Sequence, residues 1–294
     1  MLDYDSIGDL ARRAASEAVT IGRLVLADQA EQLDLPQDAL LRRMHRNLDV
    51  MRAAARDGAQ KELRSTSGLT GGDGWRMEQY AASGRALCGP LGGRAIAIAV
   101  AVAECNAAMG RIVAAPTAGS CGILPGALLS LLEAGRVTEE QAALALFTAG
   151  AVGMVIANNA GVSGAEGGCQ AECGSASAMA AAALVELQGG TPEMAAHAAA
   201  IALKNQLGLV CDPVAGLVEV PCIKRNAGGV ANAFAAADLA LAGVRSVIPV
   251  DEVVGAMREV GGAMPCALRE TAEGGLAATP TGAALREKLF GRGD

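Results

Sequence analysis

The chain has 294 residues, a formal net charge of −7, and 52% hydrophobic but only 2% aromatic residues. Nucleic-acid binding requires clustered Lys and Arg, so the acidic balance and the lack of a basic patch argue against that class of partner. With so few aromatic side chains, the core must consist of Ala, Val, Leu, Ile and Met, and strand-like alternation is scarce. We therefore predict an all-α fold, with residues 1–294 as a single helical domain.

In chain order, the first 57 residues have the pattern of two amphipathic helices, with Pro36 in the first turn of the second. This helix pair could form an appendage to the domain. Residues 65–74 (STSGLTGGDG) are too rich in Gly, Ser and Thr for anything but a loop. A helix over 75–87 and a very apolar helix after Gly89-Pro90 are expected to follow, before a second small-residue loop over 115–126.

Thr138 and Gln141 have the spacing of a capping box, and Thr191 with Pro192 is typical of another helix start. The remaining predicted helices cover residues 139–159, 175–188, 192–208, 231–242 and 251–260. A Gly-rich tail follows them. Ala-rich helices thus alternate with loops of small residues, where missing Cβ atoms let the backbone approach a ligand closely. The pattern indicates that several loops meet at one small polar pocket.

The cellular compartment is predicted from the N-terminal residues and the cysteines. The first 19 residues are charged throughout and lack the apolar core of a signal peptide. Eight cysteines in such a chain indicate a reducing compartment, so we expect a cytoplasmic protein. The longest uncharged run, 142–165, reaches membrane-spanning length only by including Gly, Ser and Asn, and a buried helix explains it equally well. We expect no membrane association.

The cysteines fall into two groups. Cys88, Cys105 and Cys266 lie in or beside apolar helix patterns and are expected to pack as small hydrophobic residues. Cys121, within TAGSCG, either packs or lines an active site. The others lie in loops or at predicted helix ends: Cys169, Cys173, Cys211 and Cys222.

This second group suggests metal ligands or structural thiols. A zinc ribbon needs two closely spaced pairs, and Cys211 and Cys222 lie too far apart to form the second. The spacing of ferredoxin clusters is also absent. However, Pro213 and Pro221 favour a fixed, non-helical geometry for these two thiols. A cluster held by only three thiolates would leave one iron open to act as a Lewis acid on a substrate hydroxyl.

Six stretches carry a resemblance to a known family. They are STSGLTGGD, NAAMGRIVAAPTAGS, NNAGVSGAEGGCQAE, LKNQLGLVCDPVAGLVEVPCIKRNA, MPCALRET and GGLAATPTG. With them, the chain resembles the α subunit of the iron–sulfur-dependent L-serine dehydratases over essentially its whole length. The resemblance implies an all-helical catalytic domain with a [4Fe-4S] cluster held by Cys169, Cys211 and Cys222. Cys173 lies outside the matched pattern.

The same resemblance implies a reaction and a partner. L-serine would lose water to give aminoacrylate, which hydrolyses to pyruvate and ammonia. In two-chain members a separate β subunit carries a regulatory domain related to ACT modules, and nothing like it is visible in this sequence. We therefore expect a β subunit as partner and a hetero-oligomer.

Substrate binding and proton transfer are less sharply indicated. Backbone N–H groups and neutral side chains bind a carboxylate well in a dry site. The candidates, each equally consistent with loop structure, are Ser65, Thr66, Ser67, Thr70, Thr117, Ser120 and Asn159. Lys224 and Arg225 either neutralise the charge of the cluster or form a solvated basic pair. His45, His197 and Lys204 are candidate bases, and none is assigned.

Two alternatives stay open at this point. The same cluster chemistry would act equally well on threonine or cysteine, since small residues would line the pocket in either case. A non-enzymatic helical subunit with a structural metal would instead use Cys173 as a fourth, saturating ligand.

Overall fold

A computed structural model describes residues 4–291 of the chain. Within this range the regular secondary structure is helical, and no strand is formed. The helices are α1 (Ile7–Ser16), α2 (Ile21–Leu33), α3 (Gln37–Gly58), α4 (Asp73–Ala82), α5 (Gly89–Ala107), α6 (Ile123–Glu133), α7 (Glu139–Ala160), α8 (Gly164–Gly167), the π-helix η1 (Gln170–Gly174), α9 (Ser175–Leu187), α10 (Pro192–Lys204), α11 (Cys222–Leu241), α12 (Val250–Ala263) and α13 (Pro280–Phe290). The prediction of an all-α fold is confirmed.

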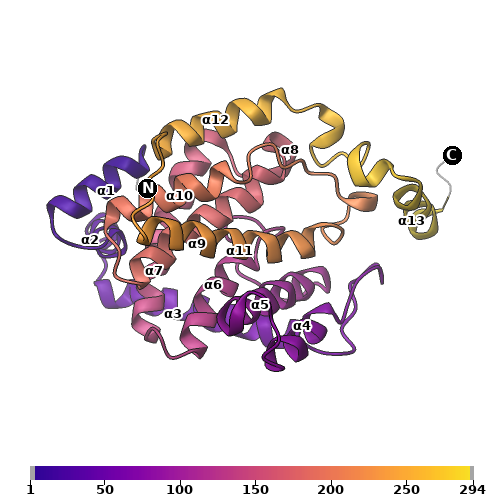
Figure 1. Cartoon of the computed structure of the whole chain (residues 1–294), viewed down its shortest axis with the longest axis horizontal. Helices are drawn as coiled ribbons and strands as arrows, with labels where there is room; N and C mark the ends of the chain where they lie inside the picture. The colour runs from indigo at the N-terminus through magenta and orange to yellow at the C-terminus, as the bar shows by residue number, and fades with distance from the viewer. Residues whose placement is uncertain (1–3, 292–294) are drawn as a thin grey trace.

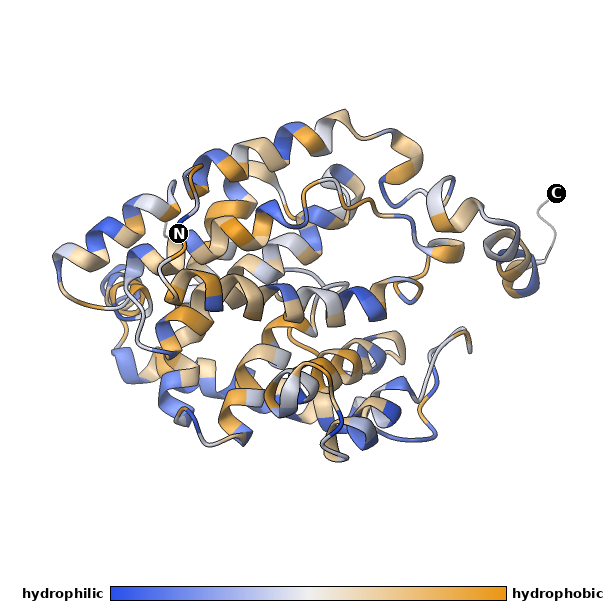
Figure 2. Ribbon diagram, viewed as in Figure 1, coloured by the Kyte–Doolittle hydropathy of each residue, from blue (hydrophilic) through white to orange (hydrophobic). Residues whose placement is uncertain are grey.

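Two helices occupy the centre of the bundle (Figure 1). α9 is buried from Ser175 to Val185 and packs against α6, α7, α10 and α11. α5 packs against α3, α4, α6 and α11. Because α6 and α11 contact both central helices, they join the two halves of the bundle. In Figure 2 the apolar residues are spread over the packed helices, whereas α13 lies apart at the edge of the molecule.

Small residues set the distance between α5 and its neighbours. A Cβ atom added at Gly58 would lie 1.7 Å from the carbonyl oxygen of Ala101, and one at Gly122 would lie 2.1 Å from that of Ala99. No side chain other than hydrogen fits at these positions. The backbone contact therefore fixes α3 and the start of α6 against α5.

The N-terminal region differs from the predicted helix pair, because it contains three helices. Thr20 accepts a hydrogen bond from the Arg23 N–H and starts α2, and Asp34 ends α2 in the left-handed conformation with φ 51°. Pro36 occupies the N-cap position of α3 and not its first turn. The cap at Thr20 thus separates α1 from α2 in a segment that the apolar spacing predicted as one helix. The three helices pack on α10, α7 and α5, respectively.

Other helix boundaries also moved. α11 begins at Cys222, far earlier than the predicted residue 231, because Pro221 sits at the N-cap, where no backbone donor is needed. The helix expected to reach residue 208 ends at Lys204. The Gly-rich tail contains α13, which the sequence did not predict and which Thr279 caps through the Gly282 N–H.

Local capping signals were reliable. The Thr138 hydroxyl accepts from the Gln141 N–H at 3.2 Å, and the Gln141 side chain accepts from the Thr138 N–H at 2.8 Å, so the predicted capping box is confirmed. Thr191 caps α10 in the same manner. Among the described residues, α7 alone has the length and composition to cross a membrane, and 67% of its apolar window is buried within the protein. That burial fits a core helix.

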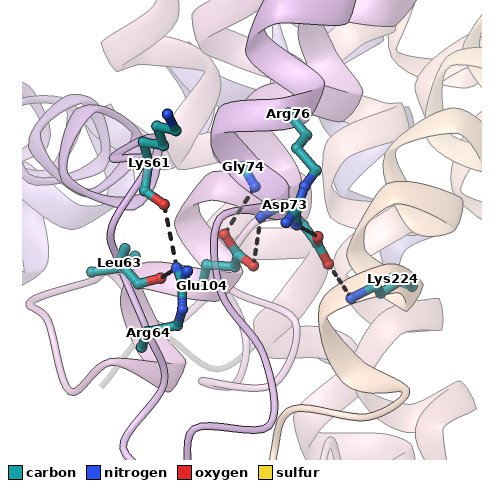
Figure 3. Close-up of polar contacts among 8 residues, drawn as sticks. All are labelled: Lys61, Leu63, Arg64, Asp73, Gly74, Arg76, Glu104 and Lys224. Atoms are coloured by element: carbon teal, nitrogen blue, oxygen red, sulfur yellow. Dashed lines mark hydrogen bonds and ion pairs between the residues drawn. The ribbon is translucent and has the colours of Figure 1, made fainter.

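A buried carboxylate anchors α4 and the loop that precedes it (Figure 3). Glu104 on α5 accepts hydrogen bonds from the N–H groups of Asp73 (3.1 Å) and Gly74 (2.9 Å), at the positive end of α4. The Asp73 side chain in turn pairs with Lys224 on α11. The first turn of α4 is therefore tied to two other helices.

The contact at Gly58 yields a stability prediction. Replacement Gly58→Ala places a methyl group against the α5 backbone and is expected to lower the free energy of unfolding by about 1–3 kcal/mol. Gly255→Ala in α12 is the matched control, since nothing lies within 4 Å of its added Cβ. The control should gain up to about 1 kcal/mol from better helix propensity. Urea unfolding of both variants measures the difference, and equal stabilities would contradict the proposed contact.

Candidate functional site

Four cysteines from three segments are buried in one region of the molecule. Cys169 precedes η1, Cys173 lies within it, Cys211 follows α10, and Cys222 is the first residue of α11. Their exposed fractions are 2%, 1%, 2% and 7%. The Cys169 and Cys173 sulfurs are 3.4 Å apart. Cys211 and Cys222 are close enough to these sulfurs for the charge on Cys169 to raise the pKa of both thiols. The structure thus brings Cys173 together with the three predicted ligands.

The segment after α12 holds Cys211 in place. The Cys211 N–H donates to the Leu268 carbonyl (2.8 Å), and the Glu270 N–H donates to the Cys211 carbonyl (2.7 Å). These bonds form a short parallel bridge between Cys211 and Arg269. Stretches that the sequence places more than 50 residues apart therefore meet at one thiol.

Arg225 is the positive group that faces the thiols. Its guanidinium donates to the Val210 carbonyl (2.7 Å) and to the Asp212 carboxylate (2.8 Å). The hydrogen bond between the Cys169 and Cys173 sulfurs, together with the charge of Arg225, lowers the pKa of Cys169. Lys224 is more exposed and pairs with Asp73. Of the two basic residues, Arg225 is therefore the one that lowers the pKa of Cys169.

Burial acts in the opposite direction on the other thiols. It raises the pKa of Cys211 well above its usual value and that of Cys222 to about 12. It also raises the pKa of Cys173, after the larger effect of its hydrogen bond to Cys169. Such thiols stay protonated, and therefore neutral, at pH 7 unless a bound cation stabilises the thiolate form.

The donor set does not match a site for one ion. Within residues 4–291, no three His, Cys, Asp or Glu side chains are arranged to hold a single metal ion. Buried, all-sulfur donors from separate segments, with one arginine nearby, suit a larger anionic iron–sulfur group. Cys169, Cys211 and Cys222 would hold such a group.

Glu172 is a site residue that the sequence analysis did not identify. Its carboxylate accepts from the Thr117 hydroxyl at 2.9 Å and lies 3.8 Å from the Cys211 sulfur. Burial raises its pKa. A Cβ atom at Gly164 would lie 2.7 Å from Glu172 Oε2 and 3.0 Å from Cys211 Sγ, so glycine is needed there. The sequence signal that could have identified Glu172 is an acidic residue between two cysteines in a glycine-rich stretch.

The first predicted substrate loop is closed on itself. The Ser65 N–H donates to the Thr70 carbonyl (3.0 Å), and the Ser65 hydroxyl accepts from the Thr70 N–H (3.3 Å) and lies 3.3 Å from the Ser67 hydroxyl. Ser65 and Thr70 are buried, whereas Thr66 is exposed and bonds to the Ala107 carbonyl. The Thr70 hydroxyl donates to Glu219 at 2.9 Å. This last contact joins the loop to the segment between Cys211 and Cys222.

The second loop, residues 115–122, is held by Asn226 of α11. Asn226 accepts from the Gly122 N–H (2.8 Å) and donates to the carbonyls of Gly119 (2.8 Å) and Cys222 (2.9 Å). Within the loop, the hydroxyls of Thr117 and buried Ser120 are 3.1 Å apart. A single fully buried amide therefore connects this loop to a predicted ligand.

Other predicted residues lie elsewhere. Asn159 is exposed at the end of α7, where its amide donates to the Asp5 and Val155 carbonyls. His45 lies on α3, and His197 lies on α10, where burial and then the charge of Arg245 lower its pKa. Lys204 ends α10. In the described part of the chain, no hydrogen bond or ion pair joins Asn159 or these three candidate bases to the four thiols.

The remaining cysteines are divided between core and surface. Cys105 and Cys121 are buried, as a packing role requires, and burial raises the pKa of Cys121 to about 12. The expectation that Cys88 and Cys266 pack in the core is wrong, because both are exposed. Cys88 occupies the N-cap position of α5, and Cys266 is the first residue of the short helical turn Cys266–Leu268. Each therefore lies at the start of a helical element and not on its apolar face.

Asn226 provides a test of the loop anchor. Asn226→Asp keeps the shape but cannot donate to the Gly119 and Cys222 carbonyls, so the free energy of unfolding should fall by about 1–3 kcal/mol. Asn232→Asp on the same helix is the control. Asn232 is only partly buried and donates to the Ala202 carbonyl at 2.9 Å, where water can replace it. Thermal unfolding should show a clearly smaller loss for the control, and equal losses would contradict the anchoring role.

Known proteins resemble this chain closely. A family model described as serine dehydratase alpha chain matches residues 16–277. A probable L-serine dehydratase alpha chain of Bacillus subtilis (strain 168) is 54% identical over 288 residues, which are 98% of this chain and 96% of that protein. The L-serine dehydratase alpha chain of Peptoniphilus asaccharolyticus is 48% identical over 276 residues, 94% of each chain.

A longer relative matches as well. The L-serine dehydratase of Streptomyces coelicolor is 39% identical over 278 residues, which are 92% of this chain and 59% of that protein. Similarity thus extends to a chain that contains additional sequence beyond the matched part.

Proposed function

Because the chain belongs to the serine dehydratase alpha chain family, we propose that it dehydrates L-serine to pyruvate and ammonia. One observation supports this activity most directly. Cys169, Cys211 and Cys222 are buried together, and both hydroxyl-rich loops are anchored next to the segment that ends at Cys222.

The proposed cofactor is a [4Fe-4S] cluster held by these three cysteines. The sulfur donors, their burial and the positive charge of Arg225 all suit an anionic cluster. When bound, the cluster supplies a Lewis acid for the β-hydroxyl of the substrate. Cys173 would remain a thiol packed against Cys169, outside the ligand set.

The chain itself would bind and orient the substrate. The hydroxyls of Ser65, Ser67, Thr117 and Ser120, with nearby backbone N–H groups, are neutral donors in a largely buried site and suit a carboxylate. Thr66 and Asn159 have structural roles instead, because both are exposed and bonded to backbone carbonyls. The surrounding burial would keep bulk water away from the aminoacrylate until it leaves and hydrolyses. The base that takes the α-proton is not assigned.

A partner chain belongs to the proposal. The first two relatives are named as alpha chains, and about two fifths of the longer relative lies outside the matched part. We propose that this chain assembles with a separate regulatory β subunit into a hetero-oligomer in the cytoplasm.

The activity is tested with anaerobically purified protein, alone and with its β chain. L-serine should give pyruvate and ammonia in equal amounts. Parallel assays with L-threonine and L-cysteine, the latter read as sulfide release, measure specificity. A β-supplemented protein that carries iron and sulfide but releases no pyruvate from L-serine would contradict the proposed reaction.

The ligand set is tested separately. Cys169→Ala, Cys211→Ala and Cys222→Ala should each lose most iron and acid-labile sulfide, because a cluster held by two thiolates is weakly bound. Cys173→Ala is the matched control, equally buried and only 3.4 Å from Cys169, and it should retain the wild-type content. Equal loss in all four variants would instead indicate a saturated structural metal.

A further inference from the structure

Most buried carboxylates in this protein have an evident structural partner. Glu104 accepts from two N–H groups at the start of α4, and Glu186 accepts from the Gly22 N–H (3.3 Å) and the Thr148 hydroxyl (2.8 Å) near the start of α2. Asp212 pairs with Arg225 at 2.8 Å. In each case a helix N-terminus or a cation stabilises the negative charge.

Glu219 is different. Its side chain is 4% exposed, and the Thr70 hydroxyl, at 2.9 Å, is its hydrogen-bond donor. Within the described residues, no Lys, Arg or His lies within ion-pair distance of Glu219. A buried carboxylate without a cation is costly, so a position of this kind suits a positively charged ligand.

The surroundings of Glu219 are those of the proposed active site. Thr70 belongs to the first hydroxyl-rich loop, and Cys222, a proposed cluster ligand, lies three residues further along the chain. Val218, which precedes Glu219, lies beside the second loop, because a Cβ atom added at Gly119 would be 3.5 Å from its side chain. Glu219 therefore lies where both loops and a cluster ligand meet.

We propose that Glu219 binds the α-ammonium group of the amino-acid substrate. This inference rests on the proposed function, because it assumes that the site takes an α-amino acid. The ammonium supplies the cation that the protein does not, and the pairing orients the substrate with its hydroxyl toward the cluster ligands. It also selects amino acids over the matching hydroxy acids.

Glu172 is the other carboxylate near the thiols, but it suits this role less well. Its oxygens already accept from the Thr117 hydroxyl (2.9 Å) and lie 3.8 Å from the Cys211 thiol. Two side chains therefore already contact the Glu172 carboxylate, whereas Glu219 accepts from Thr70 alone among the described side chains.

The test is Glu219→Gln, which keeps an oxygen for the Thr70 hydroxyl and removes only the charge. The KM for L-serine should rise by about 30-fold or more, with a smaller change in kcat, because a buried charge pair is lost. Calorimetric titration with unreactive analogues adds a readout independent of turnover. The wild type should bind L-alanine, which lacks the leaving hydroxyl, much more tightly than L-lactate, in which a hydroxyl replaces the ammonium, and the variant should lose that preference.

Two further variants complete the design. Glu186→Gln, a buried acid at the start of α2, should lower stability but leave the KM for L-serine unchanged. Glu219→Asp keeps the charge and should raise KM less than Glu219→Gln, and it replaces the latter if circular dichroism or iron content shows misfolding.

The outcomes separate the two proposals. A wild-type protein that does not turn over L-serine defeats the proposed function. An active wild type whose folded Glu219 variants keep the wild-type KM and the preference for L-alanine over L-lactate overturns the role of Glu219.

Discussion

The close approach of three helices to the backbone of α5 is the constraint on which the rest of the structure depends. Gly58 of α3 and Gly74 of α4 both meet Ala101, and Gly122, just before α6, meets Ala99. Side chains larger than hydrogen would separate these helices. Because the two hydroxyl-rich loops lead directly into α4 and α6, their positions are set by these contacts and not by the loop residues alone.

Few polar side chains are buried in this bundle, and several of them connect distant segments. Asn226 joins α11 to the loop before α6, and Glu104 joins α5 to the start of α4. Asp212 joins Arg225 to the Leu276 N–H of the C-terminal segment. A typical hydrogen bond adds only about 1 kcal/mol, but leaving such a buried group unpaired costs more. The loops around the thiols are therefore held in one arrangement without regular secondary structure.

The sequence was sufficient for the fold class and for helix starts with a local signal. The absence of aromatic and β-branched alternation indicated helices, and the side chains of Thr138 and Thr191 cap helices as predicted. It was insufficient where a cap interrupts a continuous apolar pattern, as at Thr20, or where a proline starts a helix, as at Pro221. Those boundaries depend on backbone conformation and tertiary packing.

The candidate site was predictable to a similar degree. Three cysteines followed from a family resemblance, and the structure gathers them. The place of Cys173 did not follow from spacing, because the π-helix turn determines that its sulfur meets that of Cys169. Glu172 and Glu219 escaped notice because an acidic residue in a loop is usually solvated. Their importance comes from burial, which only the folded chain reveals.

The charges around the thiols explain how this region can fold before any cofactor is bound. Burial raises the pKa of Cys211 and Cys222, so these thiols carry no charge at pH 7 in the metal-free chain. The pKa of Cys169 is lowered, because its sulfur shares a hydrogen bond with Cys173 and Arg225 lies nearby. A thiol must lose its proton to become a metal ligand, so cofactor binding would release protons and weaken in acid. The fold thus leaves Cys211 and Cys222 uncharged in the metal-free chain and supplies buried sulfur donors for the iron–sulfur cluster proposed above.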